Sequence, residues 1–306
     1  MRKVICTGET ILDILFKNNQ PIAAVPGGSS FNCIISLGRA GVPAYFLGET
    51  GEDAVGAQIA AFLKENHVHT DYFTTRKDVR TAVSLAYLNE NNDAQYVFYK
   101  EVPKPNDHFC LPDFQAQDIL VLGSYNAICP TLRGQVKRIL QGVVDAQGLV
   151  YYDINFRKTH RHELESLTPS IQENCGMADI VRGSADDFEI MYGIREAEKI
   201  YQEKIAPFCP VFICTNADKE LKVCLPGKVY SFPISPINTV STIGAGDNFN
   251  AGFVYGLMRY GIQKEELLQL DEKMWQKLIN CGLYFAANVC QSIHNSIDPN
   301  LDLSCL

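Results

Sequence analysis

Two glycines in front of an aspartate form the stretch of this sequence that is best suited to chemistry. The segment Gly244-Ala245-Gly246-Asp247 precedes an apolar pattern at helical spacing, which includes Phe249 and Phe253. Glycines let a ligand approach the main chain, and a helix N-terminus presents unpaired N–H groups and the positive end of the helix dipole. The segment therefore predicts an anion-binding turn with Asp247 as a candidate base.

A second group of polar candidates lies near the N-terminus. Asp13 stands among apolar residues, where a carboxylate is costly unless it is paired or bound. A surface position on an alternating strand is the alternative interpretation. Further on, Gly27 and Gly28 allow close approach of a ligand, and Asn32 can both donate and accept hydrogen bonds. Because most pairs of glycines are plain turns, this loop alone predicts no function.

Polar residues also follow two apolar segments in the middle of the chain. Asp153 and Arg157 are expected at the end of a strand, where an ion pair between them is one interpretation. Ser184 and Asp187 match the N-cap and the third helical position of a capping box. Capping explains Ser184 and Asp187 without a functional role.

Apolar segments of strand length alternate with helical patterns along most of the chain. The expected strands include 4–7, 42–47, 119–122, 149–154, 179–181 and 211–215, and the expected helices include 34–40, 131–147, 163–174 and much of the C-terminal third. Such alternation is typical of a doubly wound, mostly parallel α/β sheet flanked by helices, whose ligands bind beyond the carboxyl ends of the strands. We expect a single domain over residues 1–306.

The alternation stops between about residues 70 and 105. Segments 71–75, 81–89 and 94–100 look like strands, and a turn at 89–93 joins the last two. With residues 11–25, this insert is expected to form a small β sheet over one end of the main domain. Such a sheet would be either a lid or an oligomer contact.

Composition indicates a globular protein with a small-molecule partner. Of 306 residues, 46% are hydrophobic and 20% are charged, and the net charge of -8 argues against nucleic acid as a partner. No apolar run approaches the roughly 18 residues that cross a bilayer, so no membrane partner is expected. The 11 cysteines form no CxxC pair, which favours free thiols in a reducing cytoplasm.

Several common types of site find no support in the sequence. The glycine turn lacks the third glycine of a dinucleotide fingerprint, and no P-loop or GxSxG motif occurs. The histidines offer no third ligand at a standard zinc spacing. These patterns disfavour NAD binding, a P-loop phosphate site, serine-hydrolase chemistry and a zinc site.

The motifs and their order resemble the PfkB or ribokinase-like family of carbohydrate kinases, and its fructokinase-like branch in particular. Thr242-Ile-Gly-Ala-Gly-Asp247-Asn-Phe249 is similar to the family's C-terminal signature, and Pro26-Gly27-Gly28 with Asn32 is similar to its N-terminal signature. Asp153-Ile-Asn155-Phe-Arg157 resembles the Asp-x-Asn-x-Arg of the fructokinase branch. The resemblance covers nearly the whole chain and implies a ribokinase-like fold with a small β lid.

The resemblance implies transfer of the γ-phosphate of ATP to a hydroxyl of a fructose-like ketose or related sugar. Asp247 would then be the general base, and the main chain of Gly244 to Asp247 would form an anion hole. The residues implied in sugar binding are Asp13, Gly27, Gly28, Asn32 and Arg157. The residues implied in nucleotide binding are Ser184, Thr215, Asn216, Ala217, Thr242, Gly244 and Asn288. Mg2+ is the implied cofactor, with Asp187 as its ligand through water.

Three departures from the family pattern change what is expected of the nucleotide and cation sites. In Thr215-Asn-Ala-Asp-Lys-Glu220, Ala217 and Glu220 replace the two glycines of the nucleotide-binding turn, which alters nucleotide affinity or choice. Ser241 replaces an aspartate that helps many relatives bind a monovalent cation, so that site is expected to be weak. Residues 292–297 lack the Gly-Ala that usually closes the adenine pocket.

Two other functions stay open on the sequence alone. A nucleoside kinase of the same family would carry the same signatures. The altered turn after Thr215 also fits a sugar-binding protein that has lost catalysis. The resemblance further implies a homodimer through the small β sheet, while a lid on a monomer fits the residues equally well.

Overall fold

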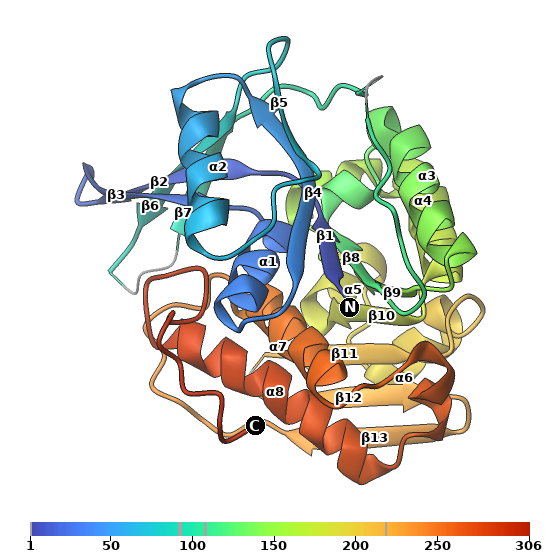
Figure 1. Ribbon diagram of the computed structural model, residues 1–306. Coiled ribbons are helices and arrows are strands. Elements are labelled where there is room, and N and C mark those ends of the chain that lie inside the picture. The colour runs from blue at the N-terminus through green and yellow to red at the C-terminus, as the bar shows by residue number, and fades with distance from the viewer. Residues whose placement is uncertain (1, 91–93, 107–108, 218) are drawn as a thin grey trace. The chain divides into compact units, whose positions relative to one another are not determined.

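The computed structural model describes residues 2–90, 94–106, 109–217 and 219–306 (Figure 1). Within this part of the chain, residues cluster into two compact units. Unit 1 comprises Met1–Arg2, Pro105–Pro236 and Arg259–Ile279, and unit 2 comprises Lys3–Lys104, Ile237–Met258 and Asn280–Leu306. The single domain expected from the sequence stays a prediction.

Unit 1 contains a sheet whose inner strands are parallel. Its strands are, in order across the sheet, β13 (Lys228–Pro233), β12 (Glu220–Leu225), β11 (Phe212–Asn216), β10 (Ile180–Ser184), β9 (Leu149–Asp153) and β8 (Ile119–Gly123). Strands β8 to β11 run parallel, and β11, β12 and β13 pair antiparallel. Every residue of β8 and β9 is buried, as expected of parallel strands covered on both faces.

Helices connect these parallel strands in the order predicted from the sequence. The elements of unit 1 are η1 (Tyr125–Ala127), η2 (Pro130–Leu132), α3 (Arg133–Asp145), η3 (Lys158–Glu163), α4 (Leu164–Met177), α5 (Ala185–Tyr192), α6 (Ala197–Ile200), the π-helix η4 (Tyr201–Ile205) and η5 (Lys264–Gln269). Helices α3 and α4 pack against each other and against β9 (Figure 1). The capping box predicted for Ser184 and Asp187 is present at the start of α5.

Unit 2 has parallel strands and the helices that carry the glycine motifs. Strand β4 (Ala44–Gly51) lies between β1 (Val4–Thr7) and β5 (Phe73–Arg76) and runs parallel to both. The helices are α1 (Ser29–Arg39), α2 (Ala54–Glu65), most of α7 (Ala245–Arg259) and the C-terminal half of α8 (Glu272–Cys290). Although one buried face was expected for α7, its residues from Asp247 to Leu257 are all buried.

The predicted small β sheet is present, with one strand fewer from the insert. Its order is β3 (Gln20–Gly27), β2 (Ile11–Lys17), β6 (Ala82–Leu88) and β7 (Ala94–Tyr99). The assignment of 71–75 to this insert is wrong, because the corresponding strand β5 pairs with β4 from Gly48 to Gly51. Residues 91–93 of the expected turn lie outside the described residues.

The start of α1 also differs from the expectation. The helix begins at Ser29, five residues before the predicted position, so Asn32 lies in its first turn. Gly28 is the N-cap residue with φ of 125°, a conformation that only glycine adopts readily. Gly28 is therefore needed to turn the chain from β3 into α1.

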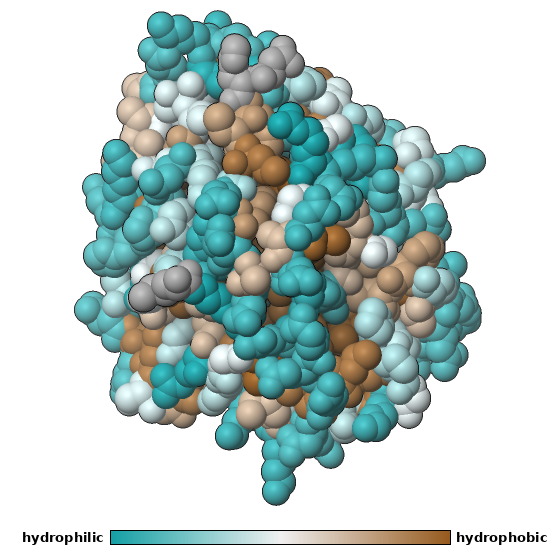
Figure 2. Space-filling model, turned by 45° about the vertical axis from the view of Figure 1, so that its right-hand side comes forward, coloured by the Kyte–Doolittle hydropathy of each residue, from teal (hydrophilic) through white to brown (hydrophobic). Residues whose placement is uncertain are grey.

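The surface and the thiols agree with the composition. On the face shown in Figure 2, hydrophilic residues cover most of the surface and hydrophobic residues form separate patches. Among the described helices, none combines the length and apolar character needed to cross a membrane. The cysteines are free thiols, and those outside positions 110 and 305 are buried.

Candidate active site

The glycine turn lies directly before α7, as predicted. Gly244 has φ of 77°, and a Cβ at this position would lie 3.1 Å from the carbonyl oxygen of Asn295. The N–H of Ala245 donates to the carbonyl of Thr242 over 3.2 Å, and the N–H of Asn248 donates to Gly244 over 2.9 Å. The turn thus brings the main chain of residues 244–247 to the N-terminal end of a buried helix, where N–H groups favour an anion.

Asp247 is held by the first turn of α1. Its Oδ1 accepts a hydrogen bond of 2.6 Å from the Ser29 hydroxyl, and its Oδ2 accepts one of 2.9 Å from Nδ2 of Asn32. The residue is only 7% exposed. Two neutral donors therefore fix the plane of this carboxylate while it stays chemically able to take up a proton.

Asp13 lies on β2, inside the small sheet, and is buried. Its Oδ1 accepts a hydrogen bond from the hydroxyl of Ser84 on the neighbouring strand β6. Burial raises the pKa of Asp13 to about 6, although the hydrogen bond from Ser84 partly lowers it. A Cβ at Gly27 would lie 2.7 Å from its Oδ2, so the glycine leaves space at the carboxylate. The alternative of a surface aspartate is wrong.

A second set of buried polar residues lies in unit 1, at the carboxyl ends of β9, β10 and β11. The Nη1 of Arg182 is 3.1 Å from Oδ1 of Asp153, and its Nη2 donates to the Thr215 hydroxyl over 2.7 Å. Burial alone would lower the pKa of Arg182, but the attraction of Asp153, Tyr151 and Asp187 together outweighs it and the pKa is raised. The guanidinium thus joins two parallel strands by charge and by hydrogen bonding.

Asp187 caps α5 beside this set. Its Oδ2 accepts from both the N–H and the hydroxyl of Ser184, over 2.8 and 2.7 Å. Burial, and after it the Asp153 carboxylate, raise the pKa of Asp187. A nearby cation would offset both effects, so the residue fits a role near a metal ion as well as its capping role.

The other predicted site residues lie at loop positions or on α8. Arg157 is exposed after β9, Asn216 ends β11, and Ala217 has φ of 47°. Residue 218 of the same turn lies outside the described residues. In unit 2, Thr242 is exposed, and Oδ1 of Asn288 accepts the N–H of Asp298 over 2.8 Å. The predicted nucleotide residues thus occur in both units.

Three residues that contact the predicted ones were missed. Ser29 and Ser84 hold the carboxylates of Asp247 and Asp13, but a serine carries no pattern that names a partner far away in the sequence. Arg182 could have been found, because an arginine between apolar residues of a short strand needs a buried partner. The ion pair of Asp153 that the structure contains is made by Arg182, whereas Arg157 was the partner considered.

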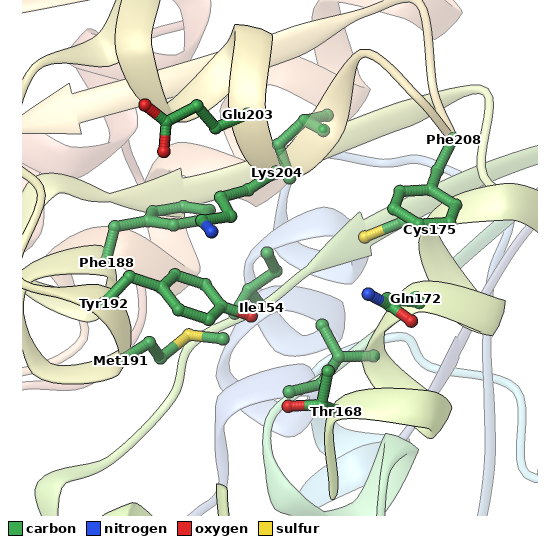
Figure 3. A pocket seen from close by; sticks show the side chains of 12 residues that line it. Ile154, Thr168, Gln172, Cys175, Phe188, Met191, Tyr192, Glu203, Lys204 and Phe208 are labelled. Atoms are coloured by element: carbon green, nitrogen blue, oxygen red, sulfur yellow. The ribbon is translucent and has the colours of Figure 1, made fainter. Parts of the chain in front are cut away.

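A cavity of about 180 Å3 in unit 1 is separate from the predicted residues. It lies among α4, α5 and η4, and Figure 3 shows Tyr192 and Met191 opposite Gln172 and Cys175. The ammonium group of Lys204 lies 4.8 Å from the centre of the Tyr192 ring. None of the residues that line the cavity was predicted to bind sugar or nucleotide.

Comparison with known proteins assigns the sequence pattern to a family. The family model described as pfkB family carbohydrate kinase matches residues 1–300. A fructokinase of Klebsiella pneumoniae is 25% identical over 266 residues, which cover 85% of this chain and 86% of that protein. The sequence similarity therefore extends over both units.

Solved structures share the fold. Aminoimidazole riboside kinase from Salmonella enterica, complexed with aminoimidazole riboside and an ATP analog, superimposes with a TM-score of 0.82 at 20% identity over 96% of this chain and 95% of that one. A fructokinase double mutant from Vibrio cholerae O395, bound to fructose, ADP and potassium ion, gives 0.83 at 21% identity over 96% and 94%. These matches establish the ribokinase-like α/β fold predicted from the sequence.

Proposed function

The chain belongs to the pfkB family of carbohydrate kinases, phosphotransferases that act on a sugar hydroxyl, and we propose that it uses ATP to phosphorylate a fructose-like ketose. The observation that carries this proposal is the geometry of Asp247. A buried carboxylate at a helix N-terminus, held by Ser29 and Asn32, lies in the same unit as the Asp13 carboxylate. A base and a group that binds hydroxyls are the two parts that the acceptor side of a sugar kinase needs.

In the proposed reaction, Asp247 acts as the general base. The acceptor hydroxyl loses its proton to a carboxylate oxygen of Asp247 as its own oxygen attacks the γ-phosphorus of ATP. The bond from that phosphorus to the bridging oxygen breaks, and ADP leaves. The hydrogen bonds from Ser29 and Asn32 keep the carboxylate in position during the transfer.

The glycine turn stabilises the charge that develops during the transfer. N–H groups of Gly244 to Asp247 at the start of α7 are fixed before the reaction, so they need little reorganisation to receive the phosphoryl oxygens. The Ala245 N–H would exchange its bond to Thr242 for one to the anion. Such preorganised donors typically contribute about 10²- to 10³-fold each.

The sugar is held through its hydroxyls by Asp13, Gly27, Gly28, Asn32 and Arg157. The carboxylate of Asp13 accepts hydrogen bonds only when it is ionised, and the glycines let the sugar reach the main chain. The raised pKa of Asp13 therefore makes sugar binding depend on pH near 6. Arg157, the residue of this set that lies in unit 1, is exposed.

The residues proposed to bind the nucleotide are Ser184, Thr215, Asn216 and Ala217 in unit 1 and Thr242, Gly244 and Asn288 in unit 2. Mg2+ would neutralise phosphate charge, and Asp187 would hold it through water. Burial and the neighbouring Asp153 carboxylate raise the pKa of Asp187, and a bound cation would offset both effects. Ala217 adopts φ of 47° without being glycine, so the turn keeps a glycine-like conformation at one of its two altered positions.

The small β sheet is proposed as the contact of a homodimer. Apolar side chains on its strands are exposed, with Phe98 51% and Tyr99 62% accessible on β7 and Ile22 51% accessible on β3. Burial of these side chains by a second copy would remove apolar surface from water. Sedimentation of the wild type and of Phe98→Glu distinguishes a dimer from a lid on a monomer.

We also infer a cytoplasmic location. The cysteines are free thiols, and such thiols are typical of a reducing compartment. Export of the chain to an oxidising compartment should give mixed disulfides through the exposed Cys110 and Cys305.

A substrate panel tests the function. Purified protein is incubated with ATP and Mg2+ and with fructose, other ketoses, pentoses and nucleosides, and ADP release is measured. The proposal expects the highest kcat/KM with a ketose. A preference for a riboside would favour a nucleoside kinase, and sugar binding by calorimetry without turnover would favour a binding protein.

A further inference from the structure

Three polar side chains from separate segments converge at Gly27. A Cβ at this position would lie 2.7 Å from Oδ2 of Asp13, 3.5 Å from Nδ2 of Asn295 and 3.7 Å from Oδ1 of Asn32. The glycine thus keeps open a small space with two acceptor oxygens and one donor nitrogen around it. A hydroxyl group both donates and accepts a hydrogen bond, so it matches this set.

The oxygen of Asn32 has a vacant acceptor position. Its Nδ2 donates to Asp247, and because a carboxylate only accepts, this bond fixes the orientation of the amide. Asn32 is 6% exposed, and within the described chain no group donates a hydrogen bond to its Oδ1. A buried acceptor without a donor is costly, and a substrate hydroxyl beside Gly27 would supply the missing bond.

Asn295 is held beside this space by a buried network. Its carbonyl accepts from Nδ2 of Asn248 over 2.8 Å, and Oδ1 of Asn248 accepts from the Ser36 hydroxyl. The Ser36 oxygen in turn accepts the N–H of Ile297 over 3.1 Å. Asn248 and Ser36 have no exposed surface. The main chain on both sides of residue 296 is therefore fixed to α7 and α1, which keeps Asn295 beside Gly27.

We propose that Asn295 is a specificity-determining residue, whose amide donates a hydrogen bond to the substrate hydroxyl that lies over Gly27. That hydroxyl donates in turn to Asp13 or Asn32. The arrangement selects polyhydroxylated substrates that carry the hydroxyl over analogues with hydrogen or methoxy in its place. This inference rests on the proposed sugar phosphorylation and adds a residue outside both signature motifs.

The test compares the wild type with Asn295→Ala, with Asn295→Leu, which keeps the volume without the amide, and with His294→Ala, an exposed neighbour, as control. KM values for the best sugar, for its monodeoxy and mono-O-methyl analogues and for ATP are measured. The expected result is a rise of about 5- to 10-fold in the sugar KM of both Asn295 variants, the size of one lost hydrogen bond, with the ATP KM unchanged. For the monodeoxy analogue that lacks the hydroxyl bound by Asn295, wild type and variants should have equal KM values, because this contact is absent in all of them.

The outcomes separate this inference from the proposed function. Turnover of a sugar with the same KM in wild type and both Asn295 variants overturns the role of Asn295 and leaves the function intact. Equal changes in the sugar and ATP KM values, with a lowered Tm, also overturn it, because they indicate a structural role. If the wild type phosphorylates no sugar, the proposed function is wrong, and the role of Asn295 is then tested by calorimetric Kd values for the sugar. Weaker sugar binding by Asn295→Ala supports the contact. Equal binding by both proteins, or no sugar binding at all, overturns it.

Discussion

Asp247 in unit 2 and Asp153 in unit 1 are both buried carboxylates, but they are held by different chemistry. Asp247 accepts hydrogen bonds from a hydroxyl and an amide, whereas Asp153 faces the guanidinium of Arg182. The guanidinium compensates the buried negative charge of Asp153 and ties it to a neighbouring strand, while neutral donors orient the Asp247 carboxylate without compensating its charge. The difference teaches that the first arrangement suits proton transfer and the second suits the joining of strands.

The largest effect is expected from Asp247→Asn. The amide can still accept from Asn32 and donate to Ser29, so the fold and the sugar affinity should persist while the base is lost. We expect kcat to fall by about 10²- to 10⁴-fold. ADP release and calorimetric sugar titration measure the two properties separately. Unchanged turnover would show that Asp247 is not the general base. The proposed difference in role between Asp247 and Asp153 would then be wrong.

Arg182→Met tests the other side of the comparison. The change leaves Asp153 buried, at 2% exposed, without its guanidinium partner. We expect the free energy of unfolding to fall by about 3–5 kcal/mol in urea titrations at neutral pH. The matched double variant Asp153→Asn with Arg182→Met should recover part of this loss. Full stability of the single variant would show that the pair does not hold β9 to β10.

A smaller effect concerns the pH dependence of sugar binding through Asp13. Because its pKa is about 6, the ionised form declines below that pH, and the sugar KM should rise about fivefold between pH 6 and pH 5. Measurements of KM from pH 5 to 8 check this. Ser84→Ala removes the hydrogen bond that lowers this pKa, so the rise should begin at higher pH. A flat profile in both proteins would contradict the role of Asp13.

Stability provides an independent measurement of the same carboxyl group. The folded-state pKa of Asp13 lies above its ordinary 3.8, so its contribution to stability is greatest below about pH 4 and is lost as the pH rises through about 6. Asp13→Asn should therefore be more stable than the wild type at pH 8 and should lose this pH dependence. Urea titrations at pH 4 and 8 compare the two proteins.

The smallest effect is expected from potassium. Ser241 is 9% exposed, and its hydroxyl accepts the N–H of Ile243 over 3.2 Å. A neutral hydroxyl attracts a monovalent cation less than a carboxylate does. Replacement of sodium by potassium at constant ionic strength should change kcat less than about twofold, because a cation that is bound only weakly contributes little to the reaction. Strong activation would place a cation site close to the catalytic turn in spite of Ser241.

Local sequence patterns correctly predicted elements whose ends are marked by capping residues. The capping box of Ser184 and Asp187, for example, is set by two residues three positions apart in the chain. The family fold and the small β sheet were also predicted correctly. The place of β5 was not, because a short strand acquires its neighbours from tertiary pairing, and only the structure shows that Phe73 faces Gly48.

The sequence predicted individual residues of the candidate site, but it did not predict which residues contact them. Asp13, Asn32 and Asp247 were singled out by residue type and motif, while Ser29 bonds to Asp247 across 218 positions of sequence. No periodic pattern encodes such a distance. Asn295 was hidden for the same reason: only the fold brings its amide to Gly27.

The network of Ser36, Asn248 and Ile297 has a consequence for the growing polypeptide. Synthesis proceeds from the N-terminus, so α1 is made long before Asn248 and Ile297, which complete the surroundings of Ser36. Until Ile297 has left the ribosome, the hydroxyl of Ser36 and the amide of Asn248 lack their native set of partners. The acceptor site can therefore be assembled only after Ile297 has been synthesised, so a nascent chain arrested inside α8 would carry the whole glycine turn without its contacts to Asn295 and Ile297.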